Sequence, residues 1–412
     1  MSDDRIDRTE LDGGLSVLTQ TVSGSRSASV GVWVRYGSAH EAPGELGAAH
    51  MLEHMVFKGT ARRSARDIAV AVERLGGSLD AYTSREHTSF QARVLGEHLD
   101  LGLDVLADLI TAPRLDCADL RLEREVVLEE ISTVEDTPDD LVFELHGQAL
   151  WPGHPYGHSI LGTRETVAGM SARDLQRIHR ERYTRGNLVV AAAGAVEHDA
   201  AVAAAARLFE GVPESTSHAT LPAVPPVVPE ERRVERPGAQ THIVSGGRAI
   251  SHRDPRRFAV GLVSTALGGG MSSRLFQRVR EELGLAYSVY TFQSFYRATG
   301  AVGVYVGTRP EWAERAVAVI REELDRVAEE GLTADELEDA KGQLRGQVVL
   351  GLETPGGRVH RLALQELYEE PQRSVDDLVA RIEAVTRGDT AEVGAEFMDP
   401  ERWLTVRLGP AH

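Results

Sequence analysis

The sequence predicts an α+β fold made of two similar domains, each with a mainly antiparallel sheet and flanking helices. Three observations favour this class. The chain has 412 residues, about twice the length of an ordinary domain, and 42% of them are hydrophobic. A proline-rich stretch divides the chain into halves. In both halves helices and hairpins come in blocks, without the strand–helix alternation of parallel α/β proteins.

The proline-rich stretch predicts the domain boundaries. Its prolines stand at positions 213, 222, 225, 226, 229 and 237. Prolines lack an amide donor and favour an extended backbone, so residues 213–238 are predicted to be a linker. It joins a first domain, 1–212, to a second domain, 239–412. The halves share a coarse order of elements, although little repeat identity is visible between them.

The elements of the first half follow from local patterns. Alternating valines predict a strand at Ser29–Tyr36. A helix is predicted from Glu45 to Phe57, closed by Lys58 and Gly59. Ser64 and Asp67 resemble a capping box that opens a helix ending near Gly76, and Pro138 is predicted to interrupt or end a long helix. The other expected elements are strands at 79–83, 88–94 and 187–196 and that long helix, at 116–131.

In the second half, helices are predicted on both sides of a glycine triplet, and strands follow them. The helices are expected at 257–267 and 272–282, and the strands at 286–292, 300–307 and 402–408. Long helical patterns fill much of the remainder.

Charge and cysteine content exclude several functions. The net charge of -18 disfavours a nucleic-acid partner, whose recognition usually shows a basic face. It would favour cationic peptides, although a charge excess more often serves solubility. The single cysteine, Cys117, excludes an internal disulfide framework and a multi-cysteine metal site. A polar, acidic N-terminus and the lack of a long apolar run predict neither signal peptide nor membrane span, so we expect a cytoplasmic protein.

The most informative segment is an H-x-x-E-H motif within the helix predicted at residues 45–57. His50 and His54 are four residues apart and therefore share one helix face, so both imidazoles can reach one zinc ion. Glu53 lies beside that face, where it can act as the base toward a water on the metal. This order of residues is the inverzincin signature. The alternative is that the histidines only line a helix face for packing or solvent.

A catalytic zinc needs a third protein ligand, and the best candidate lies within residues 122–131. There Glu123, Val127 and Glu130 share one helix face, so carboxylates lie in line with apolar side chains. A carboxylate in such a stripe needs a partner, and a metal is one. The alternative is a solvated acidic helix, and the pattern does not separate Glu129 from Glu130.

Three other histidines are weaker candidates. His154 and His158 are four apart, but Pro155 and Gly157 break the helix that would align them. His87 lies near a predicted strand edge, where an ordinary hydrogen-bonded histidine is the more frequent case.

Several separated motifs occur in an order typical of one family. They are HMLEHMVFKGT at 50–60, GGSLDAYTSREHT at 76–88, EREVVLEEI at 123–131, LGGGMSSRLFQ at 267–277 and GLAYSVY at 284–290. With these motifs the chain resembles the pitrilysin/insulysin superfamily of zinc peptidases over nearly its whole length. The most similar branch is the mitochondrial processing peptidase and its bacterial relatives.

The resemblance implies a complete site. It makes His50, His54 and Glu130 the zinc ligands, Glu53 the base and Glu123 a residue that supports the site, as carboxylates behind metal-binding histidines do. From the second half, Arg280 and Tyr287 match an Arg–Tyr pair that donates to the substrate carbonyl, where an oxyanion needs preorganised donors. Taken alone, Arg280 would more often be a surface helix residue and Tyr287 a strand core residue.

The resemblance also implies how substrate and partner bind. Relatives pair an extended peptide with a strand edge that corresponds to Leu79, Asp80, Ala81, Tyr82 and Thr83. Many relatives have Asn where this chain has Asp80, which puts substrate pairing at that position in doubt. The family's paired chains enclose a chamber like a clamshell. Because this chain holds both the zinc set and the Arg–Tyr pair, we expect a homodimer, with a heterodimer with a degenerate homologue as the alternative.

Two functions from different classes follow. The first is a zinc endopeptidase that encloses short or unfolded peptides and cleaves them with water activated by Glu53. The second is a zinc-binding but non-catalytic partner or assembly subunit, since the superfamily contains members that keep the fold without turnover. Such members typically lose metal ligands, and none is missing from this sequence.

Overall fold

The computed structural model describes residues 5–215 and 220–411, and the central strands of its first sheet are buried along almost their whole length. Its strand order is β1-β2-β6-β3-β5-β4. The strands are β1 (Ile6–Leu11), β2 (Leu15–Thr21), β6 (Leu188–Gly194), β3 (Ser27–Val34), β5 (Thr88–Leu95) and β4 (Ser78–Thr83). Only β2 and β6 pair in parallel among these described strands, and β4 forms one edge.

The second sheet repeats this arrangement. Its order is β7-β11-β8-β10-β9, with one parallel pair, β7 and β11, followed by antiparallel neighbours. The strands are β7 (Glu231–Glu235), β11 (Leu404–Gly409), β8 (Thr241–Ala249), β10 (Gly300–Thr308) and β9 (Ala286–Phe295). Two mixed, mainly antiparallel sheets with many helices confirm the predicted α+β class.

The chain forms two compact units that do not follow one cut in the sequence. The first unit contains Met1–Ser132, His158–Leu221 and Gly351–Gln372, and the second contains Thr133–Gly157, Pro222–Leu350 and Arg373–His412. Each unit therefore takes one segment from the far side of the proline-rich stretch. The division into 1–212, a linker at 213–238 and 239–412 stays a prediction.

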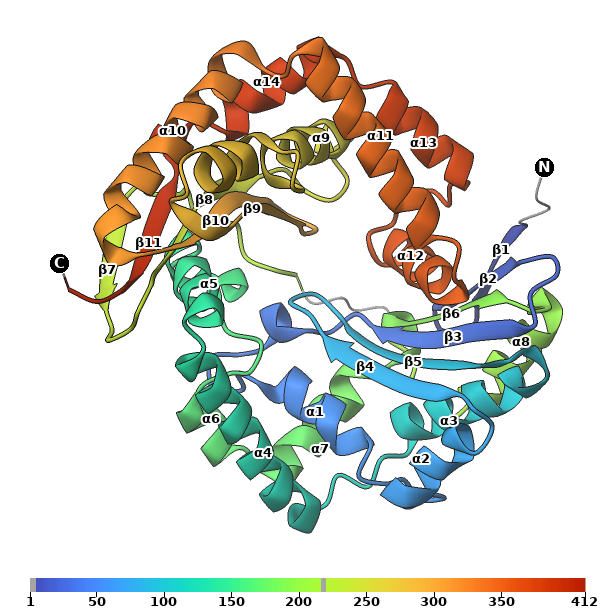
Figure 1. Ribbon diagram of the computed structural model, residues 1–412. Coiled ribbons are helices and arrows are strands. Elements are labelled where there is room, and N and C mark those ends of the chain that lie inside the picture. The colour runs from blue at the N-terminus through green and yellow to red at the C-terminus, as the bar shows by residue number, and fades with distance from the viewer. Residues whose placement is uncertain (1–4, 216–219, 412) are drawn as a thin grey trace. The chain divides into compact units, whose positions relative to one another are not determined.

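One helix in each unit comes from the other half of the chain. Helix α12 (Pro355–Leu367) packs against β6, β3 and β2 of the first sheet, as Figure 1 also shows. Its Val359, Leu362 and Ala363 lie in a core cluster with Trp33. Helix α5 (Pro138–Leu150) packs against β11 and β8 of the second sheet. The preceding helix ends at Asp136, just before Pro138, as predicted, and Pro138 itself begins α5.

The other face of the first sheet packs against helices that precede or follow its own strands. Val30 and Val32 of β3 point into a core that includes Met51 of α1, Leu106 of α3 and Ala205 of α8. These helices are α1 (Ala48–Val56), α2 (Ala65–Glu73), α3 (Leu99–Thr111), α4 (Cys117–Asp136), α6 (Arg164–Gly169), α7 (Ala172–Arg182) and α8 (His198–Leu208). The capping box predicted for Ser64 and Asp67 opens α2.

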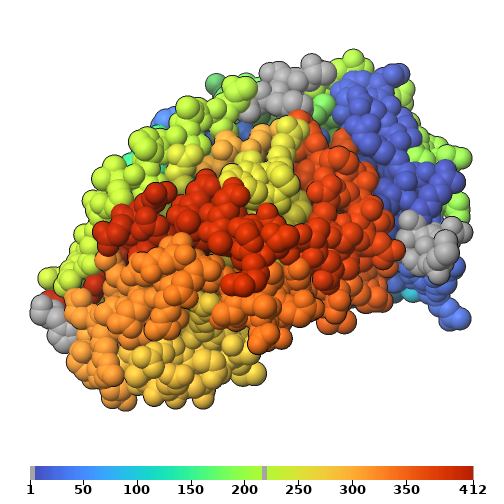
Figure 2. Space-filling view, turned by 90° about the horizontal axis from the view of Figure 1, so that it is seen from above, coloured from blue at the N-terminus to red at the C-terminus, as the bar shows by residue number. Residues whose placement is uncertain are grey.

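The second unit has its own core, built by β8, β9 and β10 with α9 and α10. Its helices are α9 (Arg257–Gly268), α10 (Ala313–Glu330), α11 (Ala334–Gly351), α13 (Val375–Glu383) and α14 (Arg387–Phe397). The helix predicted at 272–282 is a π-helix at Phe276–Glu282. Figure 2 shows the red C-terminal helices lying over the orange and yellow segments, in agreement with the contacts of α14 with α9 and α10.

Candidate metal centre

The start of helix α1 is held by one buried carboxylate. Glu41 accepts hydrogen bonds from the amides of Gly47 at 2.8 Å and Ala49 at 2.7 Å. These amides lack partners within the helix, so the carboxyl oxygens of Glu41 satisfy them. Burial raises the pKa of Glu41 to about 8, and these backbone hydrogen bonds act in the opposite direction. Gly47 has a φ of 88°, and a Cβ there would lie 2.6 Å from the carbonyl oxygen of Leu161. The motif helix therefore begins at a defined point.

This helix brings three candidate ligands together. The rings of His50 and His54 have centroids 4.6 Å apart, as residues one turn apart allow. Helix α4 supplies Glu130, whose carboxylate oxygens lie 3.6 Å from His50 Nε2 and 3.7 Å from His54 Nε2. One ligand atom from each residue lies within 4.8 Å of the others, and in the described part of the chain no second group of this kind occurs.

The donor set fits zinc. Two histidine nitrogens and one glutamate oxygen leave an open position, which is typical of catalytic zinc sites. Ligands about 2.0–2.1 Å from a tetrahedral ion are separated by roughly 3.4 Å, similar to the two separations above. Those separations are too long for good hydrogen bonds. Moreover, Oε2 of Glu130 is buried without a hydrogen-bond partner in the described structure, and a metal would satisfy it.

Burial prepares His50 for metal binding. Burial, together with the smaller effect of the neighbouring His54, lowers the pKa of His50 to about 4. Near neutral pH the imidazole is therefore neutral and has a free lone pair, the form that binds a metal.

A second carboxylate supports His54 from behind. Glu123, buried in α4, lies 3.1 Å from Nδ1 of His54 through one oxygen. Its other oxygen lies 2.5 Å from Nζ of Lys58. A carboxylate that accepts from the outer nitrogen of a metal-binding histidine fixes the tautomer that presents Nε2 to the metal. The sequence predicted Lys58 only as a residue that closes the helix. Its ion pair with Glu123 was not predicted, because the two residues are 65 positions apart.

Glu53, the predicted base, lies beside the ligand group on the same helix. Its Oε2 accepts a hydrogen bond from Oγ1 of Thr83, at 2.6 Å, on strand β4. Burial raises the pKa of Glu53, and the hydrogen bond from Thr83 acts in the opposite direction. A carboxylate with a raised pKa is better suited to exchange protons near neutral pH than a solvated one.

The structure distinguishes the two adjacent glutamates of α4. Glu130 is half-buried and lies in the ligand group, whereas Glu129 is exposed and does not. The other histidines have different partners. His154 caps a short helix at Pro155–Gly157 by accepting from the amide of Tyr156, and its Nε2 lies 3.1 Å from the carbonyl oxygen of Pro222.

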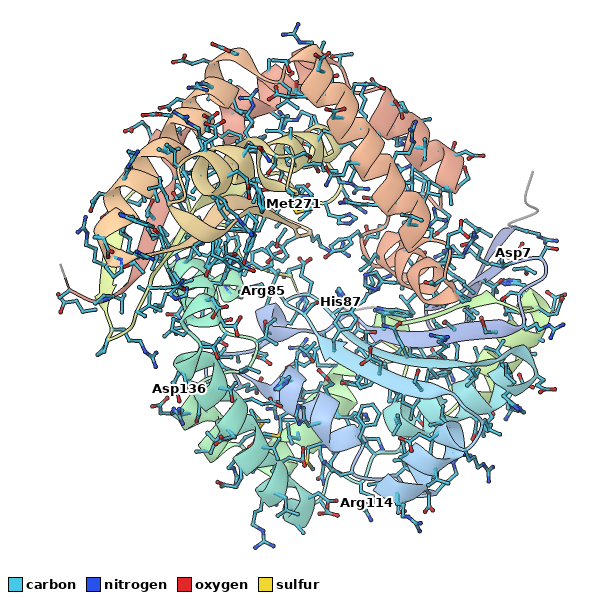
Figure 3. The ribbon with its side chains drawn as sticks, viewed as in Figure 1. Asp7, Arg85, His87, Arg114, Asp136 and Met271 are labelled. Atoms are coloured by element: carbon cyan, nitrogen blue, oxygen red, sulfur yellow. The ribbon has the colours of Figure 1, made fainter. Side chains whose placement is uncertain are left out.

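His87 is a hydrogen-bonded histidine, and burial lowers its pKa to about 3. It follows Arg85 in the turn between β4 and β5, and both are labelled in Figure 3. The hydroxyl of Tyr82 lies 3.2 Å from Nε2 of His87 and 3.3 Å from Nδ1 of His360 on α12. Tyr82 thus has contacts inside the first unit that the strand pattern did not reveal.

The predicted substrate strand, Leu79 to Thr83, coincides with β4 and lies at a sheet edge. Leu79 and Ala81 pack against the core, and Asp80 is exposed. The carboxylate of Asp80 accepts from the amide of Ala81 at 3.0 Å.

Arg280 and Tyr287 lie together in the second unit. The guanidinium of Arg280 lies 4.5 Å from the ring centre of Tyr287 and 4.6 Å from that of Phe276. It also donates to the carbonyl oxygen of Tyr287 at 3.1 Å. Tyr287 is 76% exposed, so it is not the strand core residue that its pattern alone suggested.

Two family models match the chain. "Insulinase (Peptidase family M16)" matches residues 16–164, and "Peptidase M16 inactive domain" matches residues 169–344. Among the described residues, every helix is too short or too polar to cross a membrane.

Similar proteins cover almost the whole chain. An uncharacterized zinc protease of Streptomyces coelicolor is 42% identical over 98% of this chain and 89% of its own length. An uncharacterized zinc protease of Bacillus subtilis is 36% identical over 92% of this chain and 92% of its own length. A protease from Helicobacter pylori has the same fold, with a TM-score of 0.91, 22% identity and coverage of 99% of this chain and 100% of that one.

A solved structure described as a peptidase M16 inactive domain from Pseudomonas fluorescens is equally similar in fold. Its TM-score is 0.93 at 22% identity, and it covers 99% of this chain and 98% of its own. The resemblance inferred from the motifs is therefore confirmed. By its two matching family models and its relatives along nearly the full length, the chain belongs to the insulinase family of peptidases, peptidase family M16.

Proposed function

We propose that this protein is a zinc-dependent endopeptidase that cleaves short or unfolded peptides. The observation that carries the proposal is the group formed by His50, His54 and Glu130, with Glu53 beside it on the same helix. The names of the relatives, which call them zinc proteases, support it. When bound, zinc supplies a Lewis acid that polarises the scissile carbonyl and lowers the pKa of water.

The residues of the chain divide the remaining work. His50, His54 and Glu130 hold the ion, and Glu123 keeps His54 in the tautomer that presents Nε2. Glu53 accepts a proton from the water as its oxygen attacks the scissile carbon, and delivers that proton to the leaving amine when the C–N bond breaks. Burial of Glu53 supports this role because it raises the pKa of the carboxyl group.

We assign Arg280 and Tyr287 to the oxyanion that forms on the substrate. A guanidinium and a phenol are strong donors, and preorganised donors are worth most where charge develops. Support comes from the aromatic packing that holds Arg280 in place and from the exposure of Tyr287. The edge strand β4, with Leu79, Asp80, Ala81, Tyr82 and Thr83, is the proposed site where an extended peptide pairs as an added strand.

The proposed assembly is a homodimer, since this chain has candidates for both the zinc group and the donor pair. A heterodimer with a degenerate homologue is the alternative. We place the protein in the cytoplasm, where its one cysteine, the exposed Cys117, would stay reduced.

A second function is favoured by one observation. The model that matches residues 169–344 is described as an inactive domain. This description supports, as the alternative function, a zinc-binding but non-catalytic partner or assembly subunit of a heterodimeric peptidase.

The test combines zinc content with cleavage of a quenched peptide library by the purified protein. Glu53→Gln keeps the size of the side chain but removes the proton acceptor. We expect one zinc per chain in both proteins and a cleavage rate about 10²–10⁴-fold lower in the variant. Equal cleavage by both proteins would reject the role of Glu53. Zinc in both without any cleavage would favour the non-catalytic subunit.

A further inference from the structure

Strand β4 presents its residues to two different surroundings. Leu79 and Ala81 pack against the core on the side of helix α1, and Thr83 continues this alternation. Asp80 and Tyr82 belong to the opposite face of the sheet. Thr83 is therefore the polar residue of β4 on the face toward the motif helix, and its hydroxyl lies 2.6 Å from Oε2 of Glu53.

The backbone around Thr83 is held on both sides. In the sheet Thr83 pairs with Thr88 of β5, and the following amide, of Ser84, donates to the carbonyl oxygen of His87 at 2.8 Å. The carbonyl oxygen of Ser84 accepts from the amide of Ser38 at 3.2 Å. Since threonine is branched at Cβ, its χ1 angle is restricted as well. The hydroxyl of Thr83 thus has a defined position.

Glu53 needs such a fixed partner. A glutamate has three side-chain torsions, and the loss of their freedom has a cost that a hydrogen bond can offset. Thr83 occupies Oε2, so Oε1 remains for exchange of a proton with water. A hydrogen bond to a carboxylate is short and about twice as strong as a neutral one, and 2.6 Å is within that range.

We propose that Thr83 is a positioning residue for Glu53, the general base. The inference rests on the proposed peptidase function. It adds that the base is oriented by the same strand that is proposed to receive the peptide. A peptide paired with β4 would therefore meet a carboxylate whose direction is set from within that strand. Thr83 acts on the rate of the chemical step rather than on peptide affinity.

The test uses two substitutions at position 83 and one control. Thr83→Val keeps the shape but removes the hydroxyl, and Thr83→Ser keeps the hydroxyl. Thr88→Val is the matched control, because Thr88 is the cross-strand partner of Thr83 and donates to the carbonyl oxygen of Tyr36 instead. We expect kcat to fall about 10- to 100-fold in Thr83→Val, with KM within threefold, because small misplacements of catalytic groups have effects of this size.

Thr83→Ser should restore kcat to within about threefold of wild type, and Thr88→Val should keep it. Zinc affinity should be equal in all four proteins. A second readout does not need activity: in crystal structures Glu53 should keep one rotamer in wild type and Thr83→Ser, and should occupy several in Thr83→Val.

Two results would overturn the inference. They are wild-type kcat in Thr83→Val, and a single unchanged Glu53 rotamer in that variant. A wild type that binds zinc but cleaves no peptide would instead overturn the proposed function, and the rotamers of Glu53 would still decide whether Thr83 positions it.

Discussion

Five strands of the first sheet, β2-β6-β3-β5-β4, follow the same order as the five strands of the second, yet only the first sheet is associated with a candidate metal group in the described residues. In each unit a helix follows the second of these five strands in chain order, β3 or β8, and packs against the edge strand. In the first unit this helix is α1, against β4, and in the second it is α9, against β9. The difference between them lies in their side chains.

Helix α1 is buried on one side only. Met51, Leu52 and Met55 lie in the core, while His50 and His54 remain half-buried on the other side. Helix α9 has no histidine or acidic residue, and nearly all its residues from Ala259 to Gly268 are buried. The comparison teaches that the scaffold does not determine the chemistry: one polar helix face and one glutamate from a neighbouring helix create the candidate site.

The largest expected effect comes from removing the ligand that α1 does not supply. Glu130→Gln should abolish both zinc binding and peptide cleavage, because two histidines alone are a poor site for zinc. The first unit, like the second, would then have no complete group of metal ligands among its described residues. The control is Glu129→Gln, at an exposed neighbour outside the group. Zinc content and peptide cleavage are measured together, and full zinc occupancy in Glu130→Gln would contradict the assignment.

The second unit should contribute donors rather than ligands. Tyr287→Phe and Arg280→Lys are each expected to lower kcat about 10²–10³-fold, as the loss of an oxyanion donor does elsewhere. Zinc affinity should not change in either variant. If either variant lost zinc or cleaved at the wild-type rate, the assignment of Arg280 and Tyr287 as oxyanion donors would be wrong.

A smaller effect on zinc affinity is expected from the ion pair between Lys58 and Glu123, the carboxylate that contacts His54. Lys58→Met leaves the buried Glu123 without its cation, so His54 should be less well oriented. We expect zinc affinity, measured by competition with a chelator, to fall about 10-fold. Lys58→Arg retains the charge and should lose less. Equal affinities in all three proteins would show that His54 and Glu123 suffice.

The smallest effect concerns stability and the second sheet. Burial lowers the pKa of His146, on α5, to about 4. Between pH 6.5 and about 4 the unfolded chain therefore binds more protons at this site than the folded chain, so acidification should destabilise the fold. The urea midpoint should decrease over this range, and less steeply in His146→Gln. The same slope in both proteins would assign the acid sensitivity to other groups.

Much of the fold could be predicted because its signals are local. The capping box at Ser64, the end of the long helix before Pro138 and the strand at Leu79–Thr83 depend on neighbouring residues, and the structure contains each of them. The π-helix at Phe276–Glu282 was predicted as an ordinary helix, because the spacing of apolar residues barely distinguishes the two.

These local signals did not predict that α12 packs on the first sheet and α5 on the second. Both helices show an apolar face, but periodicity says only that a face is buried and not which sheet covers it. Likewise, the contacts of Lys58 with Glu123 and of Thr83 with Glu53 could not be predicted. The partners are far apart in sequence, and no local pattern marks Lys58 or Thr83 as part of a site.

By itself the sequence determined the fold class, the inverted motif and the helix that aligns His50 with His54, because four-residue spacing on a helix is a property of the backbone. It left Glu129 and Glu130 equivalent until the family resemblance favoured Glu130. Only the tertiary structure decided which carboxylates face the histidines and which hydroxyl holds Glu53. Those contacts join segments 30 to 80 residues apart, and their distances depend on how the helices and the edge strand pack.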